Sequence, residues 1–332
     1  MTESTTGTSD STGTSDSTGI RRVTVVGGGV IGASWAALFL AHGLEVTVTD
    51  PQPGIDTQVR ELIDGTVPVL RGLGLRTAEL TRNLAFEPDL AASVREADLV
   101  QENGPERLDV KQQMWRTIEE NAPATTLFAT STSGIPATDI ATVLRRPERL
   151  VVGHPFNPPH LVPLVEIVRG EHTSEETVER ARAFYASLGK NPQVLRKEVP
   201  GFVANRLQSA LFRECVHLVA DGVVTEQELD AIVTSSIGLR WAVAGPFQTF
   251  HLGGGQGGLP HFVTHLGPGM EKRWDQMARE HVAFDDATVD TLTEQARNFG
   301  ADIDELAAER DRKQVALMRA LAETPASDAH QA

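Results

Sequence analysis

Residues 23–32 read VTVVGGGVIG, a short β-branched run that ends in a glycine turn. The spacing satisfies the pattern G-x-G-x-x-G, in which Gly27 makes a tight turn, Gly29 lets the backbone approach a phosphate, and Gly32 allows a helix to pack closely on a strand. Residues 33–42 are rich in helix formers and stop at Gly43, a typical residue just after a helix. The stretch therefore predicts the first strand, turn and helix of a dinucleotide-binding sheet.

An acidic residue follows the second β-branched run, residues 45–49, at the expected distance. Asp50 lies 18 residues beyond Gly32, near the spacing of about 20 at which a carboxylate meets the ribose hydroxyls. Its charge would repel a 2′-phosphate, so NAD is favoured over NADP as cofactor, and the helix N-terminus would face the pyrophosphate. The alternative, a glycine-rich turn without a ligand, is disfavoured by this context. The predicted cofactor-binding residues here are Gly27, Gly29, Val30, Ile31, Gly32 and Asp50.

Composition limits the class of protein. The chain has 332 residues, 40% hydrophobic and 23% charged, which suggests about two soluble domains. One cysteine, Cys215, excludes an internal disulfide framework and a Cys-rich metal site, and fits a cytoplasmic location. No run approaches the roughly 18 apolar residues of a membrane helix. The net charge of -15 argues against a nucleic acid or an anionic membrane as partner, leaving a small-molecule substrate.

The chain divides into segments of different composition and hydrophobic pattern. Residues 1–19 contain TGTSDS twice and predict a disordered tail, neither a signal nor a transit peptide. Further strand candidates are residues 99–100, 127–130, 150–152, 164–168 and 194–195. Because helical patterns fall between most of them, we expect a Rossmann-type, doubly wound, mostly parallel sheet, an α/β fold.

A different pattern begins after Pro200-Gly201, where Leu207, Leu211, Cys215 and Leu218 recur at helical spacing and no confident strand follows. We expect capping boxes at residues 173–176 and 225–228. The predicted organisation is a tail at 1–19, an NAD-binding Rossmann domain at 20–198, an all-helical second domain at 199–325, and a flexible C-terminus at 326–332.

Polar residues at the carboxyl ends of the predicted strands are candidates for chemistry, since ligands bind at that edge of such sheets. His154 follows residues 150–152 and is the one histidine of ten in this position. Imidazole has an unperturbed pKa near 6.5, which suits a general base, although a lone histidine is more often structural. Glu166 lies in the next apolar run and needs a partner there. Pairing with His154 would satisfy it; a salt bridge to an arginine is the alternative.

Five motifs occur in a fixed order: GGGVIG with Asp50, GPERLDVK, STSGI, GHPFNPPHLVPLVEIV and PGFVANRL. Together they resemble the 3-hydroxyacyl-CoA dehydrogenase superfamily over about residues 20–325. The resemblance implies that His154 and Glu166 are the catalytic pair, and that Ser133 and Asn205 are active-site residues. It further implies that the nicotinamide half of NAD contacts Glu106, Lys111 and Asn157.

Details within these motifs point to one branch of the superfamily. Pro155 directly after the histidine and the run NPPHLVPLVE are similar to the carnitine 3-dehydrogenase and L-gulonate 3-dehydrogenase (lambda-crystallin) branch. Acyl-CoA enzymes carry a Lys-rich insertion after the second strand, whereas residues 51–90 contain no lysine here. The resemblance implies NAD-dependent oxidation of the 3-hydroxyl of a small hydroxy acid, L-carnitine or a related compound first. It also implies that the helical domain at 199–325 serves substrate binding and joins two chains in a homodimer. L-Gulonate, a 3-hydroxyacyl-CoA and a crystallin-like structural or NAD-binding role remain alternatives.

Five of the 17 aromatic residues fall within 34 positions, at Trp241, Phe247, Phe250, Phe262 and Trp274. Aromatic faces suit a quaternary ammonium group. Packing in a helical core or a dimer interface is the preferred explanation for most of them, and Trp241 and Phe250 remain candidate substrate residues.

A 6-phosphogluconate-type 3-hydroxyacid dehydrogenase is a rival enzyme class, with a catalytic lysine on the first interdomain helix. Lys190 and Lys197 precede that helix, and its matching region offers Asn205 instead. This pattern disfavours the rival.

Overall fold

The computed structural model describes residues 18–300 and 302–323. The tail predicted at 1–19 lies outside these residues apart from its last two positions, and so does the predicted C-terminus at 326–332. The chain forms two compact units. The sheet unit comprises residues up to Asn205 together with Asp311–Arg319, and the helical unit comprises Arg206–Arg310 and residues from Ala320 onward. The predicted boundary near residue 198 stays a prediction.

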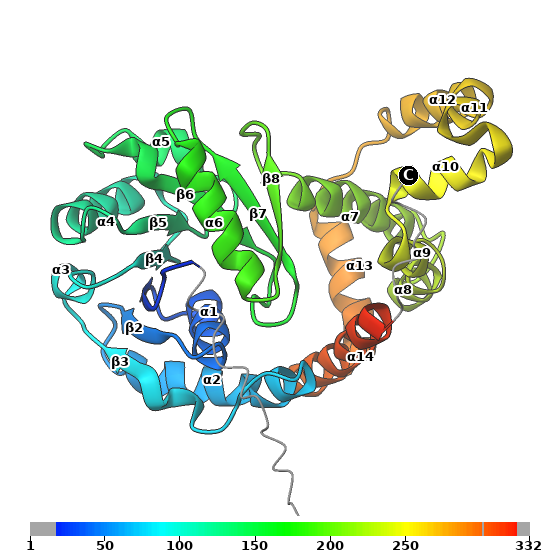
Figure 1. Ribbon diagram of the computed structural model, residues 1–332. Helices are drawn as coiled ribbons and strands as arrows, with labels where there is room; N and C mark the ends of the chain where they lie inside the picture. The colour runs from blue at the N-terminus through cyan, green and yellow to red at the C-terminus, as the bar shows by residue number, and fades with distance from the viewer. Residues whose placement is uncertain (1–17, 301, 324–332) are drawn as a thin grey trace, which may run out of the picture. The chain divides into compact units, whose positions relative to one another are not determined.

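The sheet unit is built on one eight-stranded sheet with the order β3-β2-β1-β4-β5-β6-β7-β8 (Figure 1). Its neighbouring strands are parallel except for the pair β6 and β7, so the predicted mostly parallel sheet is confirmed. The strands are β1 (Arg22–Val26), β2 (Glu45–Thr49), β3 (Leu84–Phe86), β4 (Leu99–Glu102), β5 (Leu127–Thr130), β6 (Leu150–Pro155), β7 (Leu164–Arg169) and β8 (Asn191–Leu195).

Alternate residues of the central strands enter two different hydrophobic clusters, one on each face of the sheet. Val25 of β1 and Leu99 of β4 pack with α1 and α6, whereas Val26 and Val100 pack with α4 and α5. The helices of this unit are α1 (Val30–Ala41), α2 (Ile55–Gly72), α3 (Leu90–Ser93), α4 (Leu108–Asn121), α5 (Ala137–Ala141) and α6 (Glu175–Ser187), with the 3-10 helices η1 (Leu80–Asn83) and η2 (Pro147–Arg149).

The strands β6 and β7 form the one antiparallel pair of the sheet, and their register sets His154 opposite Glu166. The connection between them is residues 156–163. Because a parallel crossover needs about a dozen residues or more, this connection forces the chain to turn back directly. Two residues that are twelve apart in the sequence thereby become cross-strand partners.

Two local predictions differ from the structure. Strand β3 was not among the expected strands. The capping box expected at residues 173–176 is wrong, because α6 is capped by Ser174, whose hydroxyl accepts a hydrogen bond from Thr177 N. The Thr173 hydroxyl is engaged elsewhere, since it donates to Leu150 O and accepts from Gly170 N. The capping box predicted at residues 225–228 is confirmed, with reciprocal hydrogen bonds between Thr225 and Glu228.

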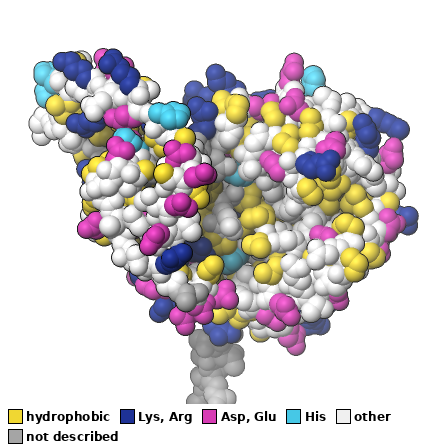
Figure 2. All heavy atoms as spheres, turned by 180° about the vertical axis from the view of Figure 1, so that it is seen from behind, with side chains coloured by type: hydrophobic (Ala, Val, Ile, Leu, Met, Phe, Trp, Pro, Cys, Tyr) yellow, Lys and Arg dark blue, Asp and Glu magenta, His cyan; other side chains and the backbone are white. Residues whose placement is uncertain are grey.

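The helical unit contains no strand among its described residues, which confirms the predicted all-helical region. Its elements are α7 (Ala204–Ala220), α8 (Glu226–Ser235), α9 (Ile237–Val243), α10 (Pro246–Gly253), η3 (Gly255–Gly257), α11 (Gly258–His265), α12 (Gly267–Met277), α13 (Asp286–Ala296), η4 (Arg297–Phe299) and α14 (Ile303–Glu323). Residues 204–205 of α7 and 311–319 of α14 belong to the sheet unit. Of the helices in residues 18–300 and 302–323, none has the length and apolarity to span a bilayer. Acidic and basic side chains are interspersed on the face in Figure 2.

Candidate active site

The glycine turn between β1 and α1 has the geometry that its motif predicts. Gly27 has a φ of 92°, and a Cβ there would lie 2.8 Å from Asn103 O. A Cβ on Gly32 would lie 1.9 Å from Gly27 O, so only glycine permits this packing of helix on strand. Gly29 caps α1 with no side-chain hydrogen bond, and the space beside it is open. An open helix N-terminus with free backbone approach fits the pyrophosphate of a dinucleotide.

Asp50 lies directly beside this turn. Its Oδ2 accepts a hydrogen bond from Gly28 N at 2.8 Å, and its Oδ1 accepts one from Gln52 N at 2.9 Å. These bonds fix the carboxylate at the carboxyl end of β2, next to the helix N-terminus formed by Val30 and Ile31. The turn and the acid together fit NAD.

A buried ion pair lies beneath the loop that follows β4. Lys111 Nζ lies 2.8 Å from Glu102 Oε1, and the two side chains are 1% and 0% exposed. Glu102 also accepts hydrogen bonds from Gly104 N at 2.6 Å and from the Thr130 hydroxyl at 2.6 Å. This network fixes the start of the loop. The predicted contact of Lys111 with the nicotinamide half of NAD stays a prediction.

Glu106, on the same loop, organises the segment after β5. Its Oε1 accepts hydrogen bonds from the Thr132 hydroxyl at 2.6 Å and from the amides of Ser133 and Gly134 at 2.9 and 3.0 Å. Burial raises the pKa of Glu106, but the Thr132 hydroxyl, the charge of Lys111 and these amides outweigh it, so the pKa lies below its ordinary value. The Ser133 hydroxyl lies 3.3 Å from the same oxygen. Two motifs that are far apart in the sequence are joined by this carboxylate.

His154 and Glu166 form the hydrogen-bonded pair that the sequence suggested. His154 Nδ1 lies 2.9 Å from Glu166 Oε2, and both residues are buried. The second carboxylate oxygen, Oε1, accepts hydrogen bonds from Val203 N at 2.9 Å and Ala204 N at 3.0 Å. No arginine is needed to satisfy Glu166.

The contacts of Glu166 determine its charge and the tautomer of its partner. Burial raises the pKa of Glu166, but the hydrogen bonds from His154, Ala204 N and Val203 N outweigh it, and the pKa lies below its ordinary value. An ionised carboxylate only accepts hydrogen bonds, so Nδ1 of the imidazole carries the proton. In the neutral ring, Nε2 is then left with the lone pair that a general base needs.

Three further residues named in the sequence analysis lie in the sheet unit. Asn205 Nδ2 lies 3.5 Å from Ser133 O, which brings the STSGI and PGFVANRL motifs together. Asn157 is exposed just after β6. Lys190, considered for a rival enzyme class, is buried, and its ammonium donates to the carbonyl oxygens of Pro159 and Val162. Burial lowers the pKa of Lys190 to about 7.

Trp241 and Phe250 lie on α9 and α10 of the helical unit, and both are exposed. Phe250 packs on Phe262, with ring centroids 4.7 Å apart. Their role in substrate binding stays a prediction.

The sequence reasoning missed two residues of this site. The Phe202 ring packs 5.3 Å from the imidazole of His154, centroid to centroid, and the backbone of Phe202 is left-handed. The sequence around Phe202 contains no pattern that predicts a positive φ at this residue. Glu102 could have been found, because a carboxylate in the apolar strand LVQE needs a cation, and Lys111 follows nine residues later.

Two family models match nearly all of the described chain. Residues 22–199 match the model described as 3-hydroxyacyl-CoA dehydrogenase, NAD binding domain. Residues 201–296 match 3-hydroxyacyl-CoA dehydrogenase, C-terminal domain.

Curated relatives and solved structures agree with these matches. The chain is 46% identical to an L-carnitine dehydrogenase of Streptomyces griseus, over 93% of this chain and 92% of the relative. It is 41% identical to an L-carnitine dehydrogenase of Pseudomonas aeruginosa, over 92% and 96%.

The crystal structure of 5-formyl-3-hydroxy-2-methylpyridine 4-carboxylic acid 5-dehydrogenase, an NAD⁺-dependent dismutase, is similar with a TM-score of 0.73 and 32% identity, covering 92% of this chain and all of that chain. The glycine turn, Asp50 and the fold all fit these matches. The chain is an NAD-dependent oxidoreductase of CH–OH groups and belongs to the 3-hydroxyacyl-CoA dehydrogenase family.

Proposed function

We propose that this enzyme oxidises the 3-hydroxyl of L-carnitine to the 3-keto acid. The observation that carries the chemistry is the bond of 2.9 Å between His154 Nδ1 and Glu166 Oε2 at the carboxyl end of β6. The choice of substrate is supported by relatives named L-carnitine dehydrogenase that are 41–46% identical over more than nine-tenths of this chain. The lack of lysine in residues 51–90 also favours a substrate without CoA phosphates.

His154 and Glu166 act on the proton of the substrate hydroxyl. Nε2 of His154 takes this proton during oxidation and returns it during reduction. Glu166 holds the imidazole in the tautomer with the proton on Nδ1 and stabilises the cation that forms. Bound NAD supplies the acceptor for the hydrogen and electron pair that leave carbon 3.

The remaining residues hold and orient the reactants. The N-terminus of α1 and Asp50 bind the pyrophosphate and the ribose hydroxyls of NAD. Ser133 and Asn205 hydrogen-bond the hydroxyl or the developing carbonyl oxygen of the substrate. Contacts of Glu106, Lys111 and Asn157 with the nicotinamide half of NAD belong to the same proposal.

Trp241 and Phe250 are proposed as aromatic faces for the quaternary ammonium of the substrate. The support is their exposure, which leaves ring surface available in the helical unit, and the neighbouring Phe262 ring, which adds a second aromatic side chain beside Phe250.

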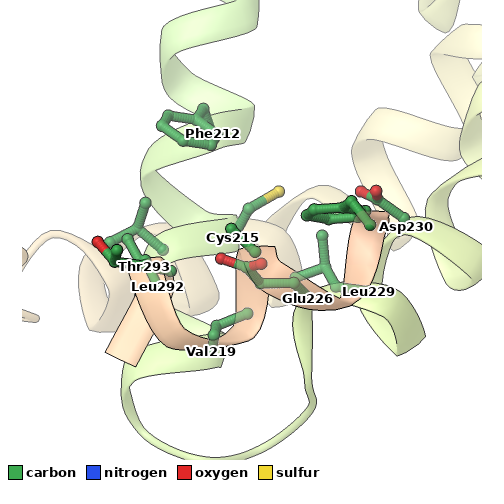
Figure 3. Close-up of a pocket in the computed structure, with 11 residues that line it drawn as sticks. Phe212, Cys215, Val219, Glu226, Leu229, Asp230, Leu292 and Thr293 are labelled. Carbon is green, nitrogen blue, oxygen red and sulfur yellow. The ribbon is translucent and has the colours of Figure 1, made fainter. Parts of the chain in front are cut away.

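We also propose that the enzyme is a homodimer joined through the helical unit. Three apolar side chains of its described residues are buried, those of Val216, Val219 and Leu229. Large apolar side chains are instead exposed, such as Phe247 at 77% and Leu252 at 68%. A mostly apolar hollow of about 470 Å³ between α7, α8 and α13 adds to this surface (Figure 3).

So much exposed apolar surface favours burial against a second copy. Sedimentation equilibrium should give twice the chain mass of 35.8 kDa. A monomer at all concentrations would contradict the dimer. A cytoplasmic location is proposed from the single cysteine and from NAD use.

The substrate proposal is tested by following NADH absorbance with L-carnitine, L-gulonate and 3-hydroxybutyryl-CoA, each with NAD. We expect turnover with L-carnitine and kcat/KM at least about 100-fold higher than with the other two, because they lack the ammonium or add a CoA group. Activity confined to the CoA ester would overturn the proposal. Binding of NAD without turnover of any substrate would favour a structural role.

A further inference from the structure

Phe202 has an unusual backbone. Its φ is 51°, directly after Gly201 with a φ of 72°, so two successive residues are left-handed. Among the described residues, Glu79 is the other non-glycine residue with a positive φ. Glycine adopts this conformation freely, whereas for a bulky aromatic residue it is a steric outlier. Such strain persists only where surrounding contacts impose it, and it gathers at functional sites.

The left-handed pair determines where the next two amides point. After Phe202 N donates to Val199 O at 3.0 Å, the chain turns into α7. The amides of Val203 and Ala204 then both donate to Oε1 of Glu166. The carboxylate is therefore held by backbone atoms on the side away from His154.

The side chain of Phe202 reaches the other partner of the pair. It is 1% exposed, and its ring plane is tilted by 56° to the imidazole of His154 at a centroid distance of 5.3 Å. Behind it, the ring packs with Ala137, Val152 and Val168. The ring thus lies in contact with both the sheet core and the imidazole of His154.

We propose that Phe202 is a positioning residue for the His154–Glu166 pair: its ring fixes the plane of the imidazole, and its strained backbone aims two amides at the carboxylate. The proposal rests on the proposed function, in which His154 is the general base. Phe202 serves both purposes, because the contact with the imidazole needs a bulky ring and the direction of the chain into α7 needs a positive φ. A glycine at this position would satisfy the backbone and lose the ring; an extended residue would fill the core and misdirect the amides.

The test compares the natural protein with Phe202→Leu, which keeps apolar bulk but removes the ring. Phe202→Met, with adaptable apolar volume, replaces it if the leucine variant does not fold. Glu79→Gly is the control for a substitution at a non-glycine residue with the same φ of 51°, at an exposed position before η1 and outside the contacts of the pair.

The first readout needs no substrate: proton exchange at His154 Nδ1, followed by NMR on ¹⁵N-histidine-labelled protein and assigned by its loss in His154→Gln. The second readout is kcat and KM for NADH formation. We expect Phe202→Leu to speed exchange and to lower kcat by roughly 5- to 30-fold, with KM for NAD changed by less than about 2-fold. Glu79→Gly should leave both readouts unchanged.

Each outcome decides between the two proposals. Exchange and kcat within about 2-fold of the natural protein in Phe202→Leu would overturn the positioning role. A rise in the KM for NAD equal to the loss in kcat/KM would also overturn it, because kcat would then be unchanged and the substitution would have weakened only the binding of NAD. Faster exchange in a protein whose natural form turns over no hydroxy acid would support the positioning role and refute the proposed function.

Discussion

Replacing Glu166 with glutamine tests the catalytic pair with little change of shape. In the natural protein, Oε2 accepts from His154 Nδ1 at 2.9 Å, and Oε1 accepts from the amides of Val203 and Ala204. Glutamine keeps one oxygen for the two amides and turns its NH₂ group toward Nδ1. Because that group only donates, Nδ1 must then accept, and the ring proton moves to Nε2. The nitrogen that should take the hydroxyl proton is then already protonated.

The magnitude follows from the roles that are lost. The wrong tautomer and the loss of a negative charge beside the imidazolium together predict a decrease in kcat of roughly 10²- to 10⁴-fold. The fold should change little, because the amides at the start of α7 keep an acceptor. In Glu166→Ala these two amides lose their acceptor, which should cost about 1–3 kcal/mol for each one that stays unsatisfied, in addition to the loss of activity.

The assay combines NADH formation at saturating L-carnitine with urea unfolding of the natural protein and both variants. We expect Glu166→Gln to lose activity at nearly natural stability, and Glu166→Ala to lose both. Turnover of Glu166→Gln within about 3-fold of the natural enzyme would refute the tautomer argument. A stability of Glu166→Ala equal to that of Glu166→Gln would show that the two amides find another acceptor.

Three further predictions follow from the contacts of the sheet unit. Asp50→Ala should raise the kcat/KM ratio of NADP to NAD by about tenfold or more, because the charge that repels a 2′-phosphate is gone; an unchanged ratio would contradict the role of this acid. Lys111→Met should lower the free energy of unfolding by about 3–5 kcal/mol, because it leaves the buried charge of Glu102 without its cation. Adding Glu102→Gln should recover part of this loss, and equal stability of the single and double variants would argue against the pair. Folding lowers the pKa values of Glu106 and Glu166. Their contributions to the free energy of unfolding are therefore complete above the ordinary pKa of 4.5 and disappear as the pH falls through the lower native pKa values. Urea unfolding below pH 4.5 should therefore show a shallower loss of stability for Glu166→Gln than for the natural protein, and parallel profiles would contradict the assignment.

Much of the sheet unit could be predicted from local sequence. The glycine turn after residues 23–26 and the β-branched run 45–49 specify strand, turn and helix through steric rules that act over a few residues. Strand β3, only three residues long, has too little pattern to be recognised. The capping error at Thr173 has a similar cause, because Ser174 offers the same hydroxyl chemistry one position later.

The pair of His154 and Glu166 was predictable as a pair of residue types, but its geometry was not. The position of Glu166 in an apolar run indicated that it needed a partner, whereas only the antiparallel register of β6 and β7 sets it opposite His154. The connection of eight residues, 156–163, is too short for a parallel crossover and therefore makes β6 and β7 antiparallel. The contribution of Phe202 could not be foreseen, because a positive φ at an aromatic residue depends on tertiary contacts that override local preference.

The most direct test of the account is the activity of His154→Ala, measured together with its affinity for NAD. Calorimetric titration should give an NAD dissociation constant within about 3-fold of the natural protein, since the groups at the N-terminus of α1 and Asp50 are untouched. NADH formation from L-carnitine should fall by roughly 10²- to 10⁴-fold. An alanine variant that binds NAD and turns over L-carnitine at a near-natural rate would show that the imidazole beside Glu166 is not the base.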